Sequence, residues 1–148
     1  MFIQTDNITQ IATELNEMLH DCIVENGIFV PVNKNTIRYK NYLISRGKDN
    51  SWNVKTARGR IYNTFLKLSA FAICKLDESS DYENINSVIS YDKIFEKNYT
   101  DATQYKYIIK HSKDEVTQDV VLWRYEMVTK VADQAKRKIK RIFYMQIA

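Results

Sequence analysis

The fold of this chain is decided by residues 36–76, which read TIRYKNYLISRGKDNSWNVKTARGRIYNTFLKLSAFAICKL. Apolar and polar side chains alternate over most of this stretch, and a period of two is typical of strands that bury one face. Turn-forming residues interrupt the alternation at Arg46–Asn50 and at Ala57–Gly59. The pattern therefore predicts a meander of antiparallel strands. The predicted strands lie at about 36–45, 51–56 and 60–65.

Alternation assigns each strand residue to one of two faces of the predicted sheet. The apolar face is predicted to hold Ile37, Tyr39, Leu43, Trp52, Val54, Ile61 and Phe65. The opposite face is predicted to hold Arg38, Lys40, Tyr42, Lys55, Arg60 and Tyr62. Asn41 falls on the apolar face, which indicates a bulge or a shifted register. Residues 66–76 are predicted to form a helix that covers the apolar face, because they include small and branched residues that suit close packing.

The predicted basic face belongs to the most one-sided charged stretch of the chain. Between Lys34 and Lys67 there are nine basic side chains and one acid, Asp49, so the local net charge is +8. Aromatic rings are interleaved with these bases, and this combination suits phosphate attraction and base stacking. Three interpretations are open: a solvated surface whose lysines deter aggregation, a nucleic-acid interface, or a surface for an acidic protein partner. The candidate nucleic-acid-binding residues are Arg38, Lys40, Tyr42, Lys55, Arg58, Arg60 and Tyr62.

The N-terminal segment is predicted to form an amphipathic helix between Ile8 and Ile23, where apolar residues recur at steps of three and four. Acids on its polar face give residues 1–33 a net charge of −5. A short β-rich segment at Ile28–Val30 follows. Pro31 confines this segment to a sheet edge or a loop, because proline has no backbone N–H to donate.

Further helices are predicted after residue 76. Apolar spacing indicates one helix over part of 84–97 and another that begins near Thr100. A capping box at Ser112–Glu115 then precedes a long apolar stripe. The stripe consists of Val116, Val120, Trp123, Met127, Val131, Ala135, Ile139 and Ile142. A helix of about 30 residues would be about 45 Å long, so its end is expected to project or to pack on a second copy.

This last predicted helix ends in a second basic patch, which consists of Lys136, Arg137, Lys138, Lys140 and Arg141. Bases in a last turn complement the helix dipole. Two other interpretations are open: the patch contacts phosphates as a second nucleic-acid surface, or it binds an acidic groove on a partner subunit. In a symmetric antiparallel homodimer through this helix, the patch would face Asp114, Glu115 and Asp119 of the other copy.

The length of the chain predicts a single domain over residues 1–148. The predicted elements make it an α+β domain: an N-terminal helix, a small antiparallel sheet of three or four strands, and three or four helices that end in a long C-terminal helix. Apolar residues make up 45% of the chain, yet no apolar run approaches the length of a membrane span. The N-terminus lacks the pattern of a signal peptide. Cys22 and Cys74 are expected to be buried thiols. We therefore expect a soluble cytoplasmic protein, in the host cytoplasm if the chain is viral, with no membrane partner.

No catalytic, metal-binding or cofactor-binding motif is found in the sequence. His20 and Cys22 would project about 200° apart on a helix and cannot bind one metal, and His111 belongs to a different predicted helix. The three glycines are scattered singly, so no phosphate-cradling loop is present. The acids between Asp77 and Glu83 lack the glycine and the distant glutamate of a calcium loop. We expect a non-enzymatic binding protein without a cofactor.

The strand and helix positions resemble the DNA-binding modules of phage-integrase type. The matching residues are Tyr42-x-Ile44, Trp52-x-Val54, Gly59-x-Ile61 and Thr64-Phe65-x-Lys67-x-Ser69-Ala70-x-Ala72. In those modules a three-stranded sheet backed by a helix places its exposed face in the major groove. The resemblance implies that Arg38, Lys40, Lys55, Arg60 and Tyr62 occupy that face. The composition, rich in residues that an AT-rich genome encodes, also resembles that of small proteins of marine bacteriophages.

Two functions from different classes follow from these patterns. The first is nucleic-acid contact through the basic sheet face. The second is a protein-interaction or structural subunit that self-associates or docks on a partner protein. The overall net charge of only +4 favours the second function, because the acidic segments would repel nucleic acid. The segregation of charge along the chain favours the first function only if both basic patches face the same way.

Overall fold

The computed structural model describes residues 29–147, so the helix predicted between Ile8 and Ile23 lies outside the described residues. The described chain is an α+β protein with a five-stranded antiparallel sheet followed by three helices. The strands are β1 (Val30–Asn33), β2 (Thr36–Tyr39), β3 (Tyr42–Arg46), β4 (Trp52–Lys55) and β5 (Ile61–Thr64). The helices are α2 (Lys67–Glu78), α3 (Tyr82–His111) and α4 (Glu115–Ile147).

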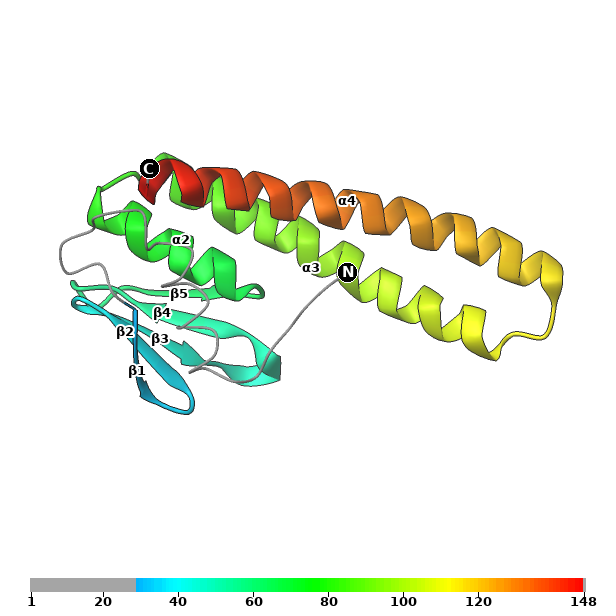
Figure 1. Ribbon diagram of the computed structural model, residues 1–148, viewed down its shortest axis with the longest axis horizontal. Coiled ribbons are helices and arrows are strands. Elements are labelled where there is room, and N and C mark those ends of the chain that lie inside the picture. Colours follow the sequence, from blue (N-terminus) through cyan, green and yellow to red (C-terminus); the bar gives the residue numbers. More distant parts are fainter. Residues whose placement is uncertain (1–28, 148) are drawn as a thin grey trace.

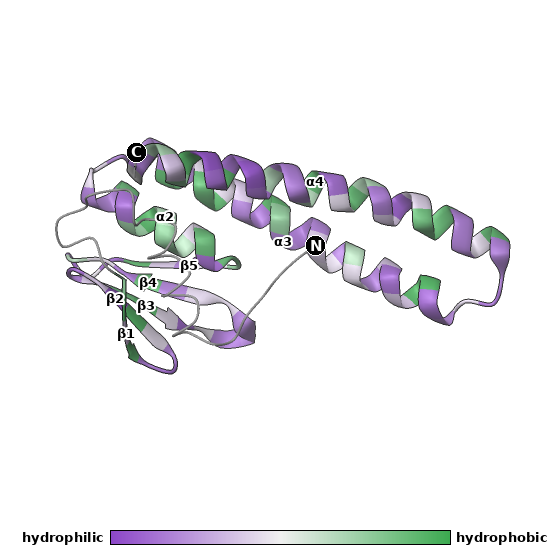
Figure 2. Cartoon of the chain, viewed as in Figure 1, coloured by the Kyte–Doolittle hydropathy of each residue, from purple (hydrophilic) through white to green (hydrophobic). Residues whose placement is uncertain are grey.

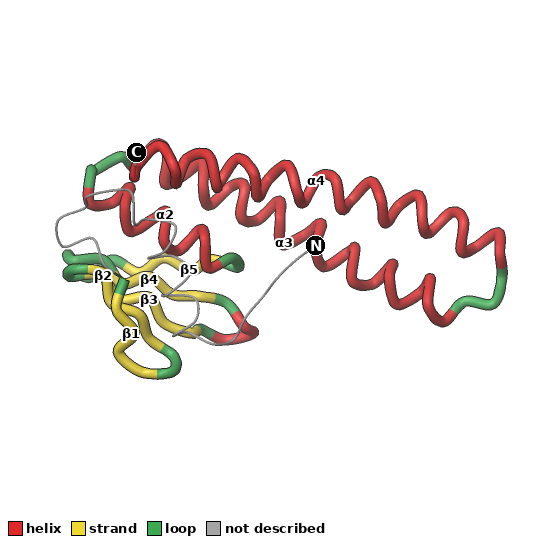
Figure 3. Tube along the Cα trace, in the orientation of Figure 1, coloured by secondary structure: helices red, strands yellow, loops and turns green. Residues whose placement is uncertain are grey.

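These elements form three layers (Figure 1). The sheet is the first layer, α2 is the second, and the antiparallel hairpin of α3 and α4 is the third. Helix α2 contacts β3, β4 and β5 on one side and both long helices on the other. Every residue from Ser69 to Leu76 is buried, as expected for a helix that is enclosed on all sides. Figure 3 shows that the hairpin extends well beyond the sheet and α2.

The strands pair in chain order, so the sheet is a simple meander. The predicted strand at 36–45 is in fact two strands, because a two-residue turn at Lys40 and Asn41 separates β2 from β3. Lys40 has a φ of 50°, which suits a tight turn and not a strand. Tyr39 pairs directly with Tyr42, so both side chains point to the same face of the sheet. The turn therefore inverts every face assignment that follows it within the predicted strand.

The covered face of the sheet differs from the prediction at these inverted positions and also on β5. It is formed by the buried residues Ile37, Tyr39, Tyr42, Ile44, Trp52 and Val54. Leu43 and Ile61, which were predicted to be in the core, are 38% and 65% exposed on the open face. Ile61 is placed there because it pairs with Lys55, which also points away from α2. Strand β1 pairs only with β2, and Pro31 therefore lies in an edge strand, as predicted.

Helix α3 is continuous where two helices were predicted. No glycine or proline interrupts residues 97–100. The side chains of Asn98 and Thr103 donate hydrogen bonds of 2.7 and 3.0 Å to carbonyl groups one turn earlier, so both polar residues fit within the helix. Helix α4 is capped by Asp114 and not by Ser112: the Asp114 carboxylate accepts the N–H of Val116 at 3.2 Å.

The apolar stripe predicted along α4 lies on two different faces. Ala135 and Ile139 are buried, whereas the five stripe residues from Val116 to Val131 are all exposed. Each step of four residues advances a helix by about 40° beyond a full turn. Three such steps in succession, from Met127 to Ile139, carry the stripe from the outer face to the inner face. The inner face is completed by Val121, Ala132 and Phe143.

Candidate nucleic-acid interface

The face of the sheet that α2 leaves open carries a row of side chains across all five strands. The strand register aligns Val30, Arg38, Leu43, Lys55 and Ile61. All of these residues are exposed. The two cations, Arg38 on β2 and Lys55 on β4, are separated by one strand, so their backbones are about 10 Å apart. The row therefore alternates apolar and positively charged side chains.

A second row on the same face is polar and uncharged. The register aligns Thr36, Ser45, Asn53 and Asn63. The Asn63 Nδ2 group donates to Oδ1 of Asn53 at 2.9 Å and to Oγ of Ser51 at 3.0 Å. Amide and hydroxyl side chains of this kind hydrogen-bond to base edges and to phosphates. No local sequence pattern predicts this row, because its members align only once the turn lengths and the register are known.

Two of the predicted interface residues point instead toward the C-terminal end of α2. Tyr42 is buried, and its hydroxyl donates to Oδ2 of Asp77 at 2.8 Å. Lys40 Nζ lies 2.5 Å from Oε1 of Glu78. The other oxygen of Glu78 accepts a hydrogen bond of 2.7 Å from the Tyr39 hydroxyl. These contacts hold the β2–β3 turn against α2, and they remove Lys40 and Tyr42 from the open face.

The buried ammonium group of Lys75 completes this network. Its Nζ donates to the Tyr39 hydroxyl at 2.7 Å and lies 4.7 Å from the centre of the Tyr39 ring. Burial, together with hydrogen bonds to Glu78 and Asp77, raises the pKa values of Tyr39 and Tyr42 well above their ordinary range. Both hydroxyls therefore remain protonated donors at neutral pH.

The same network predicts a pH-dependent contribution of Glu78 to stability. Although burial raises it, the hydrogen bonds from Lys40 and Tyr39 leave the pKa of Glu78 below its ordinary value of 4.5. The folded state therefore binds fewer protons than the unfolded state, and the stabilisation is lost as the pH falls through this region. We expect the stability difference between the wild type and Glu78→Gln to shrink below about pH 4.5 in urea unfolding curves. A difference that stays constant from pH 6 to pH 3 would contradict this.

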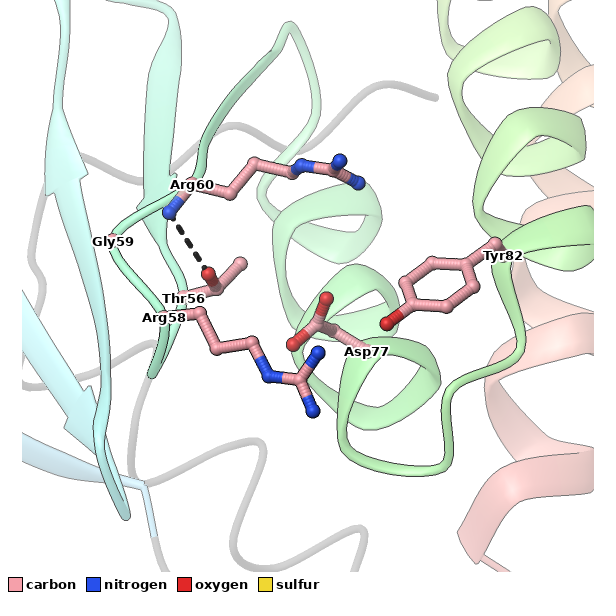
Figure 4. A pocket seen from close by; sticks show the side chains of 6 residues that line it. All are labelled: Thr56, Arg58, Gly59, Arg60, Asp77 and Tyr82. Carbon is pink, nitrogen blue, oxygen red and sulfur yellow. Dashed lines mark hydrogen bonds between the residues drawn. The ribbon is translucent and has the colours of Figure 1, made fainter.

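Arg58 and Arg60 lie at a pocket between the β4–β5 turn and the helices (Figure 4). The pocket has a volume of about 770 Å³ and is lined by Thr56, Arg58, Gly59, Arg60, Asp77 and Tyr82. The turn is fixed by Gly59, whose φ is 86°, and by a hydrogen bond of 3.1 Å from the Arg60 N–H to Oγ1 of Thr56. In Figure 4 the side chains of Arg58 and Tyr82 both point toward Asp77. Because a carboxylate stands among the cations, the pocket is a mixed-charge site.

Tyr62 is half-buried and lies on the side of the sheet that faces the helices. Its hydroxyl accepts a hydrogen bond of 3.0 Å from Nη1 of Arg60. The predicted site residues are therefore divided between two regions. Arg38 and Lys55 share the open face, whereas Lys40, Tyr42, Arg58, Arg60 and Tyr62 gather at the end of the sheet near the acidic end of α2.

The second basic patch, at the C-terminal end of α4, lies on the opposite side of the molecule from the open face. Helix α2 separates this end of α4 from the sheet (Figure 1). Lys138 Nζ lies 5.1 Å from the centre of the Tyr91 ring on α3. Lys136 is half-buried, and burial together with the nearby charge of Lys140 lowers its pKa. The two basic patches therefore do not form one surface, and the segregation of charge along the chain does not favour nucleic-acid contact.

Within residues 29–147 no group of three or more His, Cys, Asp or Glu side chains is arranged to hold a metal ion. Over the same residues, no helix is both long enough and apolar enough to cross a membrane. No protein-family model matches the chain, and no curated protein or solved structure is significantly similar to it.

Proposed function

We propose that this chain is a non-enzymatic binding protein that contacts nucleic acid through the open face of its sheet. The observation that carries the proposal is the composition of that face. Arg38 and Lys55 stand beside a row of amide and hydroxyl side chains, and none of the five strands contains an acidic residue. A sheet face of this kind attracts phosphates, and its strands carry no acidic side chain that would repel them. It also offers groups that can distinguish bases.

The shape of this part of the molecule also supports the proposal. The major groove of DNA admits a two-stranded β-ribbon, and several DNA-binding proteins read the groove with strands. Arg38 and Lys55 would contact phosphates or guanine, and Asn53 and Asn63 would contact base edges. Exposed Leu43 stands between the two cations and would make an apolar contact, for example with a thymine methyl group. Helix α2 supports the sheet from behind, as in the modules that the sequence resembles.

We expect the double variant Arg38→Glu/Lys55→Glu to lose at least tenfold in affinity for duplex DNA at low salt. The reason is that each replacement removes a phosphate contact and adds a repulsive charge. With two cations on the open face, the logarithm of the affinity of the wild type should fall with the logarithm of salt concentration with a slope of about −2. Fluorescence anisotropy with labelled duplex DNA, single-stranded DNA and RNA measures both effects.

The matched control is Lys93→Glu/Lys106→Glu, which introduces the same change of charge at two exposed lysines of α3. This control should reduce the affinity much less, because α3 lies behind the sheet. Equal losses for the two double variants would indicate only a general effect of net charge. A wild-type chain that binds none of the three nucleic acids at low salt would remove the proposal.

A second proposed function is self-association through α4, and a separate observation favours it. The first five residues of the stripe on α4 are exposed in the single chain, although they are large and apolar. A helix face of this kind is typical of a protein-interaction surface. Sedimentation velocity of the wild type over a range of concentrations tests this function, and a monomer throughout that range would exclude it. The predicted role of the basic patch in complementing the helix dipole is wrong, because α4 continues to Ile147 and its last turn contains no basic residue.

A further inference from the structure

The exposed part of the α4 stripe forms a continuous apolar surface, here called the outer stripe. It consists of Val116, Val120, Trp123, Met127 and Val131. Trp123, at its centre, is 63% exposed. Figure 2 shows that hydrophobic residues continue along the part of the hairpin that projects beyond the sheet and α2. Monomeric proteins rarely leave such a surface bare, so the outer stripe requires an occupant.

The spacing of the outer stripe is that of a coiled-coil seam. Its first four residues follow one another at steps of four, three and four, which keep a seam on one side of a helix. The two flanks of this seam carry opposite charges. One flank holds Asp119 and Glu126, and the other holds Arg124. A surface that is acidic along one edge and basic along the other is complementary to a copy of itself.

We propose that the outer stripe is the seam of a parallel homodimer, in which the α4 helices of two copies pair side by side. The proposal deepens the second function above and rests on it. In a parallel pair, a residue on the first flank faces the residue five positions later on the second flank of the other helix. Asp119 then faces Arg124 of the partner subunit, and the two-fold axis forms this contact twice.

The charges of α4 disfavour the antiparallel pairing that the sequence analysis considered. An antiparallel pair brings each flank against the same flank of the other copy, so Asp119 and Glu126 would meet acids. The parallel arrangement avoids this conflict.

The length of the seam predicts a weak and reversible dimer. From Val116 to Met127 the seam spans about 17 Å. It ends there because Lys130 occupies the next seam position, where two ammonium groups would meet. This length places the interface at the small end of specific protein interfaces, and a dissociation constant in the micromolar range is expected.

The first test compares two apolar residues of α4 that are equally exposed. Met127, in the seam, is 45% exposed, and Leu122, on a different face of the same helix, is 43% exposed. Met127→Glu should weaken dimerisation at least tenfold in sedimentation equilibrium, whereas Leu122→Glu should leave it unchanged. Circular dichroism verifies that both variants are folded. A dimer that tolerates Met127→Glu overturns the outer stripe as the interface and leaves self-association itself intact.

The second test determines orientation by charge reversal. Asp119→Arg should weaken a parallel dimer, and the double variant Asp119→Arg/Arg124→Asp should restore it. In an antiparallel dimer Asp119→Arg would instead strengthen the association, and that result would overturn the proposal. Val116→Cys, in a Cys22→Ser background, should form a disulfide-linked dimer on oxidation, because only parallel pairing brings the two copies of residue 116 together. A wild-type monomer at about 100 µM would overturn both this inference and the function on which it rests.

Discussion

Replacing Trp52 with alanine should lower the free energy of unfolding by about 3–5 kcal/mol. Trp52 lies on β4 and is only 3% exposed, and the Arg46 guanidinium lies 4.7 Å from the centre of its ring. Removal of the indole leaves a cavity beneath α2, and α2 is held by the long helices behind it and cannot fill the space. Because small domains are stable by only about 5–15 kcal/mol, this loss should be obvious in urea unfolding curves.

The control for this prediction is Leu43→Ala on the neighbouring strand β3. Leu43 points away from α2, so its truncation should cost less than about 1 kcal/mol, mostly through lower strand propensity. This comparison also tests the register of the sheet, because an uninterrupted strand over 36–45 would bury Leu43. Equal costs for the two variants would mean that the faces of β3 have been assigned wrongly.

The sequence was informative where turn signals were strong. Gly47 and Gly59 mark the two connections that bound β4, and the predicted strands at 51–56 and 60–65 agree with β4 and β5 to within one residue at each end. The helix predicted at 66–76 corresponds to α2, because its small and branched residues suit a helix that is enclosed on all sides. Local chemistry was sufficient for these elements.

The turn at Lys40 and Asn41 could not be found in this way. It contains neither glycine nor proline, and lysine rarely adopts the positive φ that Lys40 has. The alternation of polar and apolar residues also continues through it with little disturbance, apart from the misplaced Asn41. In a two-residue turn, the residues on either side of the turn point to the same face of the sheet. A prediction without the turn therefore places Leu43 on the covered face, which Ile44 occupies in the structure.

The candidate interface was predictable only in part for the same reason. Arg38 precedes the missed turn and Lys55 lies in a strand with clear boundaries, and both are on the open face as expected. Lys40 lies in the turn that was not predicted, and Tyr42 follows it directly. The acidic partners of both residues, on α2, are more than 30 residues away in the chain. The turn places Tyr42 on the covered face, and the ion pair with Glu78 holds Lys40, so no local pattern reports either position.

A buried carboxylate that the sequence analysis also missed joins α3 to the start of α2. Leu66 is the first residue before α2, and no side chain near it in the sequence caps the helix. Instead, Asp92 of α3 accepts the N–H groups of Phe65 and Leu66 at 2.7 and 2.9 Å, and the Ser69 hydroxyl at 2.7 Å. Burial raises the pKa of Asp92, and these three donors oppose that effect. The carboxylate thus fixes the segment that leads into α2 from a different helix.

Asp92→Ala should therefore destabilise the protein by about 3–5 kcal/mol, because it leaves three donors without a partner in a buried site. The matched comparison is Asp81→Ala, which removes the cap of α3 at a less buried position and should cost only about 1 kcal/mol. Hydrogen exchange adds a local measurement: the amides of Phe65 and Leu66 should lose protection in Asp92→Ala and keep it in Asp81→Ala. If Asp92→Ala unfolds no more easily than Asp81→Ala, the carboxylate does not couple the two helices, and the junction between β5 and α2 must be held by the packing of Phe65 against Phe95 and Tyr99.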